Sequence, residues 1–170
     1  MAGVRTLADG KTKLTILTTP PANLAAITAT ELAAGIDASC AVAKSGTRFS
    51  ATNSDTVADA RLCDESNANA LGSSNYEGAI VPFWLLDEDG SYAAADNPVY
   101  EAARLKGTEL TYVLREGPSA KTAWASGDRY DVFVGVSDNP QRPSEGTGYV
   151  KRTIPIEVQS ALLDQTVAGA

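Results

Sequence analysis

Three segments in the C-terminal half of the chain alternate apolar and polar residues with a period of two. This period places the apolar side chains on one face of an extended chain, which is typical of a half-buried antiparallel strand. A chain with three such segments has to pair them in a sheet and cover the apolar face. The segments span residues 109–115, 129–137 and 153–160.

Two residues inside apolar segments predict irregular points in the sheet. Gly135 interrupts the second alternating segment, and we expect it to mark a bulge or a close contact between backbones. Pro82 lies in another apolar segment, so we expect that strand to have a free or bulged edge. Further strands are predicted where apolar or β-branched residues concentrate, at residues 11–18, 36–43, 48–52 and 76–86.

Helix signals are few. Asn97 can cap a helix over residues 98–106, because the proline that follows it suits the first helical position. Thr28 and Glu31 have the spacing of a capping box, which predicts a helical turn near residues 27–34. Many strands and turn-rich connections therefore predict a mainly β fold, an antiparallel β-sandwich or barrel with one flanking short α-helix.

The chain has 170 residues, which is the length of one domain. We predict a β-sandwich domain over residues 12–160, a flexible N-terminal arm at 1–11 and a C-terminal arm at 161–170. Asn, Ser, Asp and Ala dominate residues 53–75, the least regular part. We expect a long interaction loop over residues 44–75, with a disordered excursion as the alternative.

Histidine is absent, which removes the commonest general base and the commonest transition-metal ligand. No phosphate-binding or dinucleotide-binding glycine motif is present either. We therefore expect a protein that is not an enzyme and that carries no cofactor and no metal. A net charge of −7, from 14 basic and 21 acidic residues, argues against sequence-specific DNA binding, which needs a basic face.

Cys40 and Cys63 lie in no metal-binding spacing. We expect two free thiols, buried or partly buried, in a protein made in a reducing cytoplasm. A disulfide between the two cysteines remains the alternative. No apolar run reaches the roughly 18 residues that span a membrane. The N-terminus lacks the apolar core of a signal peptide, so we expect no membrane insertion.

Asp87, Glu88 and Asp89 form the densest carboxylate cluster, and Gly90 follows them. We favour a solvated hairpin turn here, because an Asp-Gly pair suits the tip of a hairpin. The alternatives are an acidic surface with a role of its own and a calcium site. A calcium loop would need a glutamate further along, and none follows at the required distance.

Six segments resemble, in the same order, segments of the tail tube proteins of long-tailed bacteriophages, of the siphophage type found among actinobacteriophages. The resemblance extends over residues 12–160 and rests on the co-linear set, not on one motif. The segments are Ala-Gly-Ile-Asp-Ala-Ser-Cys (34–40), Asp-Ala-Arg-Leu-Cys (59–63), Asn-Tyr-Glu-Gly (75–78), the predicted helix at 98–106, Gly-Thr-Glu-Leu-Thr-Tyr-Val-Leu-Arg-Glu-Gly (107–117) and Ser-Gly-Asp-Arg-Tyr-Asp-Val-Phe-Val-Gly-Val-Ser (126–137).

This resemblance implies a structural virion protein that assembles with copies of itself. It implies hexameric rings whose inner sheets join into a lumenal barrel, and rings that stack through a long loop and terminal arms. The implied partners are the tape measure protein, the tail terminator and the tail-tip or baseplate proteins, with DNA passing transiently through the tube. The implied location is the virion tail, assembled in the host cytoplasm, and no catalytic residues are implied.

Two surfaces follow as hypotheses. Charged residues in and beside the irregular segment suit contacts between rings, and acidic residues elsewhere suit a lumen or acidic surface that lets DNA pass without binding. The first set comprises Arg48, Asp55, Asp59, Arg61, Asp64 and Glu65. The second set comprises Asp87, Glu88, Asp89 and Glu157.

Two other functions stay open at this point. A capsid decoration protein or a tail-terminator subunit could share the size, acidity and β content of this chain. A monomeric β-sandwich module that binds carbohydrate could use Trp84 and Trp124 as stacking platforms. We expect the larger aromatic residues, namely Tyr76, Phe83, Trp84, Trp124 and Tyr130, to be core or subunit-interface residues instead.

Overall fold

A computed structural model describes residues 7–58, 63, 69–143 and 148–169 of the chain. The fold is mainly β, which confirms the predicted class. The helices are short: α1 (Ala29–Ala33), α2 (Pro98–Ala103) and a 3₁₀ turn at Ala94–Asp96. The strands are β1 (Thr12–Leu17), β2 (Ile36–Asp37), β3 (Arg48–Thr52), β4 (Thr56–Ala58), β5 (Asn69–Leu71), β6 (Asn75–Ile80), β7 (Glu109–Glu116), β8 (Arg129–Ser137) and β9 (Ile154–Thr166).

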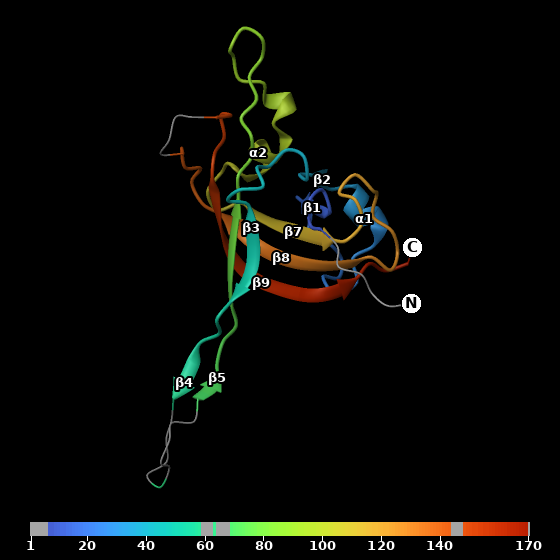
Figure 1. Cartoon of the computed structure of the whole chain (residues 1–170), viewed down its shortest axis with the longest axis vertical. Coiled ribbons are helices and arrows are strands. Elements are labelled where there is room, and N and C mark those ends of the chain that lie inside the picture. Colours follow the sequence, from blue (N-terminus) through green and yellow to red (C-terminus); the bar gives the residue numbers. More distant parts are fainter. Residues whose placement is uncertain (1–6, 59–62, 64–68, 144–147, 170) are drawn as a thin grey trace.

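Seven strands form one antiparallel sheet in the order β2-β1-β7-β8-β9-β6-β3, and β4 pairs with β5 in a separate ribbon. Figure 1 shows β3 and β6 running along the long axis of the molecule, whereas β7 and β8 run across it. The strand β9 connects the two directions, because its first residues pair with β6 and the rest pair with β8. One sheet therefore folds over on itself and supplies both layers of a sandwich.

Close packing at Gly135 makes this bend feasible. A Cβ atom at Gly135 would lie 2.4 Å from Cγ2 of Ile156, a distance at which something has to shift. The register of β8 against β9 also shifts between Val134 and Gly135, as at a β-bulge, and bulges increase the local bend. The expected bulge at Gly135 is confirmed, and the close approach there is to the side chain of Ile156 and not to a backbone.

The main core lies inside the fold of the sheet. Phe49 of β3 stacks on Tyr112 of β7 with 4.6 Å between ring centroids and lies 5.5 Å from the ring of Phe133 on β8. Tyr76 of β6 meets the Phe133 ring edge-on at 6.2 Å. The alternating residues predicted to share a face join this cluster, namely Leu110, Tyr112 and Leu114 on β7 and Ile154, Ile156 and Val158 on β9.

A second core covers the opposite face of β1, β7 and β8. Its buried members come from the sheet, from α1 and from the loops beside it, and they include Leu32, Trp124 and Tyr130. The predicted capping box at the start of α1 is present: Glu31 N–H donates to Thr28 Oγ1 at 3.2 Å, and Thr28 N–H donates to the Glu31 carboxylate at 2.8 Å. Donation from the N–H groups of Ala22 and Thr28 lowers the pKa of Glu31.

A buried arginine holds the loop between β7 and β8. Arg115 is 1% exposed, and its guanidinium donates to the Asp128 carboxylate at 2.5 Å and lies 4.9 Å from the ring centre of Trp124. Its neighbour across the β1–β7 ladder, Lys13, is also buried and donates to Asp37 at 2.5 Å. The guanidinium of Arg115 further donates to the carbonyl groups of Ser119, Thr122 and Ala123.

The predicted C-terminal arm at 161–170 is wrong for residues 161–166, which continue β9 along β8. The period-2 pattern ends at Leu162-Leu163, where Asp164 takes a positive φ of 56° and its N–H donates to Asp131 at 2.7 Å. This irregularity hides the continued pairing from sequence reasoning. Val167 is then buried in the second core.

Two predicted strands are shorter than expected. The strand expected over 36–43 ends at Asp37, because Ser39 N–H donates to the Asp37 carboxylate at 3.0 Å and turns the chain. The strand expected over 76–86 ends at Ile80, before Pro82, which has no N–H to continue a ladder.

Three further expectations concern the N-terminal arm, membrane insertion and metal binding. Residues 1–6 of the predicted N-terminal arm lie outside the described residues. No helix in the described ranges is long and apolar enough to cross a membrane. Within the same ranges, no group of three or more acidic or cysteine side chains could hold a metal ion.

Replacing Arg115 by methionine tests the buried cation. We expect Arg115→Met to lower the free energy of unfolding by about 3–5 kcal/mol, because Asp128 and three carbonyl groups lose their buried partner. The control Arg129→Met breaks an exposed ion pair with Asp164 and should cost less than about 1 kcal/mol. Urea unfolding at one protein concentration measures both, and equal midpoints would contradict the role given to Arg115.

Candidate assembly surfaces

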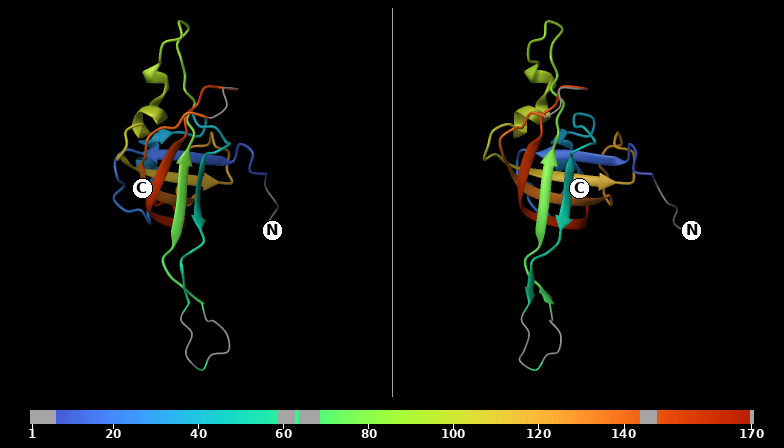
Figure 2. Two further views of the ribbon diagram at one scale, coloured as in Figure 1. Left: turned by 90° about the vertical axis from the view of Figure 1, so that its left-hand side faces the viewer. Right: turned by 60° about the vertical axis from the view of Figure 1, so that its left-hand side comes forward.

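The segment between β3 and β6 projects from the body as a long hairpin. Figures 1 and 2 show it extending along the long axis, with the β4–β5 ribbon far from the sheet. Every residue of β4 and β5 is exposed. In its described residues the predicted interaction loop at 44–75 comprises a turn, the strand β3 and a two-stranded ribbon, and its role in assembly stays a prediction.

Hydrogen bonds at the root of this hairpin set the direction of the ribbon. The Asn75 side-chain amide donates to the Asp55 carboxylate at 2.9 Å and to the Asn53 carbonyl at 3.1 Å. Asp55 N–H donates to the Ser73 carbonyl at 2.9 Å. Asp55 therefore braces the two chains of the hairpin where they leave the sheet.

The other residues of the predicted inter-ring set have different positions. Arg48 begins β3 in the sheet, at the end of the strand away from the ribbon, and forms an ion pair with Glu77 at 2.6 Å. The remaining members, Asp59, Arg61, Asp64 and Glu65, lie outside the described residues.

At the opposite end of the long axis, a loop rises beyond the body next to α2 (Figure 1). We call residues 85–96 the raised loop. Its tip holds the predicted acidic turn: Gly90 N–H donates to the Asp87 carbonyl at 2.9 Å, and Gly90 has a positive φ of 83°. The chain returns beside itself through an isolated bridge between Leu86 and Tyr92. Asp87, Glu88 and Asp89 thus lie on a protruding tip.

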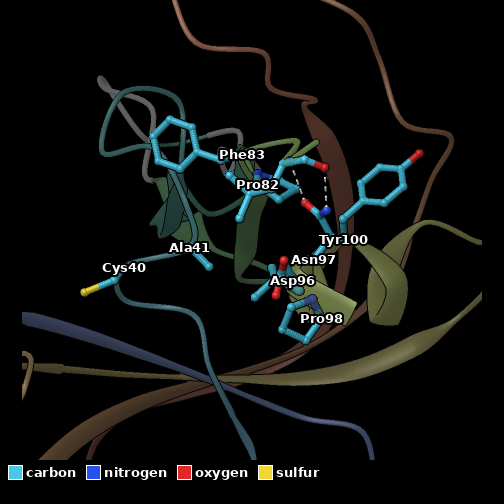
Figure 3. A pocket seen from close by; sticks show the side chains of 10 residues that line it. Cys40, Ala41, Pro82, Phe83, Asp96, Asn97, Pro98 and Tyr100 are labelled. Atoms are coloured by element: carbon cyan, nitrogen blue, oxygen red, sulfur yellow. Dashed lines mark hydrogen bonds between the residues drawn. The ribbon is translucent and has the colours of Figure 1, made fainter. Parts of the chain in front are cut away.

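The side chain of Asn97 anchors this loop. Sequence reasoning did not find this anchoring role. The Asn97 side-chain amide donates to the Leu85 carbonyl at 2.9 Å, and its Oδ1 accepts from Leu85 N–H at 2.9 Å (Figure 3). The same amide donates to the Ala93 carbonyl at 2.6 Å. Asn97 precedes α2 as predicted, but its side chain makes no capping hydrogen bond. Because Asn97 is buried, these bonds fix the base of the loop.

Trp84 lies in an aromatic cluster under the same loop. Its ring centroid is 4.6 Å from that of Tyr92 and 4.9 Å from that of Tyr100, and the Arg152 guanidinium lies 4.3 Å from it. Burial, reinforced by donation to the Glu101 carboxylate, raises the pKa of the Tyr92 hydroxyl. Trp84 is therefore packed on several sides.

Trp124, the second proposed sugar platform, is buried in the second core, where its Nε1 donates to Thr15 at 2.9 Å. The two tryptophans thus do not form a shared stacking surface. Cys40 and Cys63 are both free and exposed, so the expectation of buried or partly buried thiols is wrong. The two cysteines form no disulfide with each other.

An exposed group of large apolar side chains lies beside the raised loop. Tyr149 is 84% exposed, and Leu85, Leu86 and Val150 are about half exposed. The ring of Phe83 meets that of Tyr149 edge-on at 6.0 Å, and Trp84 N–H donates to the Val150 carbonyl at 2.9 Å. Residues 83–86 and 149–150 together line an open groove. We call Phe83, Leu85, Leu86, Tyr149 and Val150 the upper apolar patch.

The outer face of β3, β6 and β9 is polar and uncovered. Because Phe49, Tyr76 and Ile156 point into the core, the residues alternating with them point outward. Figure 2 shows β3 and β6 in front of the body, with no described element over them. We call this the bare face, and its residues include Ser50, Glu77, Ala79, Glu157 and Gln159.

The predicted acidic set is divided between two places. Glu157 is an exposed residue of the bare face, in the middle of the sheet. Asp87, Glu88 and Asp89 lie on the raised loop instead. The four carboxylates therefore do not form one acidic surface, and the assignment of either group to a lumen stays a prediction.

Comparison with known proteins gives a family and a fold. A sequence model of the family described as "Phage tail tube protein" matches residues 1–170. No curated protein sequence matches the chain. A similar solved structure is a chain of the "Cryo-EM structure of the anti-feeding prophage (AFP) baseplate, 6-fold symmetrised", with a TM-score of 0.52 and 9% identity over 95% of this chain and 96% of that chain.

Exchanging one atom of Asn97 tests its role in the raised loop. In Asn97→Asp a carboxylate oxygen replaces the amide nitrogen and faces two carbonyl groups. We therefore expect the free energy of local opening of residues 85–96 to fall by about 1–3 kcal/mol. Hydrogen–deuterium exchange of the unassembled protein should show faster exchange there. Asn23→Asp is the matched control, because Asn23 is exposed and only accepts, from Ala25 N–H at 3.0 Å. Equal exchange in both variants would contradict the anchoring role.

Proposed function

Because this chain belongs to the phage tail tube protein family, we propose that its copies form six-subunit rings that stack into a tail tube, through which DNA passes into the host. The family is structural and not enzymatic, so the chain is a structural component of a phage virion. The number six is supported by the fold, which is similar to that of a chain in a baseplate described as six-fold symmetrised.

The observation that carries this proposal is the bare face of β3, β6 and β9. A sheet face in a monomer is normally buried when it is apolar and solvated when it is polar. This face has small and polar residues, with Glu157 and Gln159 exposed. Such a face suits the wall of a water-filled channel.

The edge of the sheet supports lateral assembly. Within the described ranges β3 pairs only with β6, so the N–H and C=O groups on its other side have no partner strand. An open edge of this kind is a template for pairing with another chain. In the proposed ring, this edge meets the neighbouring subunit, and the bare faces together line the bore.

The charge of the bore follows from the same placement. Arg48 is paired with Glu77, so Glu157 adds a negative charge that the face does not balance. A negative wall repels phosphate groups, which lets DNA slide past without binding. Within the tube we propose the tape measure protein as the occupant before DNA, with the tail terminator and tail-tip or baseplate proteins at the two ends.

Electron microscopy of the purified full-length chain tests the assembly itself. We expect tubes of constant width that show stacked rings, together with large species in size-exclusion chromatography. Isolated rings or shells without tubes would favour a tail-terminator or capsid decoration protein instead. A stable monomer that binds glycans would favour the carbohydrate-binding alternative.

Thiol labelling tests which face lines the bore. In a chain with Cys40→Ser and Cys63→Ser, we expect Glu157→Cys in tubes to react with a small maleimide but not with a bulky PEG-maleimide, which cannot enter the channel. Arg104→Cys, at the exposed C-terminal end of α2, serves as the control and should react with both reagents. Blocking of both reagents at residue 157 would place it in a subunit interface and contradict the proposed bore.

A further inference from the structure

Exposed apolar side chains lie at both ends of the long axis of the molecule. On the β4–β5 ribbon, Val57 is 58% exposed and Leu71 is 81% exposed. The segments that carry the upper apolar patch, residues 83–86 and 149–150, lie toward the other end, beside the raised loop (Figures 1 and 2). Large apolar residues that stay exposed in this way mark interaction sites when they form a contiguous patch.

The ribbon is apolar on both of its faces. Val57 lies opposite Ala70 in the ladder and Leu71 lies opposite Thr56, so Val57 and Leu71 point to opposite faces. A two-stranded ribbon alone is marginally stable in water and gains stability by packing against other elements. Within the described residues, no element of the same chain covers either face. A groove, which contacts both faces, suits this ribbon better than a flat surface.

We propose that the β4–β5 ribbon of one copy docks in the groove of the upper apolar patch of a second copy, in the adjacent ring. This proposal rests on the proposed ring assembly and adds the acceptor surface, the residues on each side and the direction of the contact. Val57 and Leu71 are the inserted side chains. The acceptor residues come from two segments, with Leu85 and Leu86 on one and Tyr149 and Val150 on the other.

The positions of the two surfaces favour a second copy as the occupant. A contact between unlike surfaces at opposite ends of one subunit is head-to-tail, and it repeats without closing when the copies are related by translation along that axis. The same contact made by every subunit of a ring multiplies the strength of a weak single contact. A small ribbon can therefore hold two rings together.

Charge sets the position of the ribbon within the groove. Among the described residues of this segment, Asp55 at the root of the ribbon carries a negative charge, whereas Lys151 and Arg152 directly follow the patch residue Val150. Opposite charges across an interface select register and orientation. The docked ribbon lies toward Lys151 and Arg152 and away from the acidic turn at 87–89.

Mixing two defective variants tests the pairing directly. The ribbon variant carries Val57→Asp and Leu71→Asp, and the patch variant carries Leu86→Asp and Val150→Asp. Each alone should form rings and lose tubes. A mixture should form paired rings that do not grow further, because the ribbon variant keeps an intact patch and the patch variant keeps an intact ribbon.

The controls separate this proposal from the ring assembly on which it rests. Leu105→Asp changes another exposed leucine, 58% exposed, outside both surfaces and should leave tubes unchanged. Tubes from either defective variant, or single rings only in the mixture, would overturn the docking proposal while leaving ring formation intact. Failure of the wild-type chain to form rings or tubes would overturn the proposed function itself.

Cross-linking gives a second measurement that does not depend on the loss of assembly. In the Cys40→Ser, Cys63→Ser chain, Leu71→Cys with Leu86→Cys should give a ladder of disulfide-linked multimers when the assembled tubes are treated with a mild oxidant. Leu71→Cys with Leu105→Cys should give none. The absence of a ladder in tubes of the first variant would overturn the proposed contact.

Discussion

The contact between Gly135 and Ile156 determines how the sheet is arranged. A side chain at position 135 would collide with Ile156 at 2.4 Å, so only glycine lets β8 approach β9 this closely. At the same point β9 passes from β6 to β8, since Ile156 pairs with Gly78 on one side and Ser137 on the other. The bend that follows brings β3 and β6 over the core and leaves their outer face bare, with the ribbon extending beyond the body.

The structure separates a firmly held body from its exposed ends. In the body, buried Lys13 and Arg115 lie side by side on β1 and β7. Lys13 binds a carboxylate and one backbone carbonyl, and Arg115 binds a carboxylate and three backbone carbonyl groups. At the ends, the side chains of Asn75 and Asn97 fix the roots of the hairpin and the raised loop. The exposed apolar residues are thereby presented in fixed directions, which reduces the entropy lost when a partner binds.

Sequence reasoning found what short-range patterns encode. Alternation located β7, β8 and the first half of β9, and the spacing of Thr28 and Glu31 located the start of α1. It missed the second half of β9, where Leu162-Leu163 breaks the period although the backbone still pairs. It also assigned Asn97 a helix-capping role that its side chain does not have. The carbonyl groups that Asn97 contacts are brought to it only by the tertiary fold, so no local pattern reveals them.

The candidate surfaces were harder to predict for the same reason. The ribbon has no buried face, so its strands lack the alternation that identifies a half-buried strand. The upper apolar patch combines residues some 60 positions apart in the chain, a juxtaposition that no local pattern encodes. The ribbon and the upper apolar patch are unlike surfaces. An assembly that joins one to the other is therefore directional and can grow without a fixed length. In such an assembly the proposed tape measure partner would set the length.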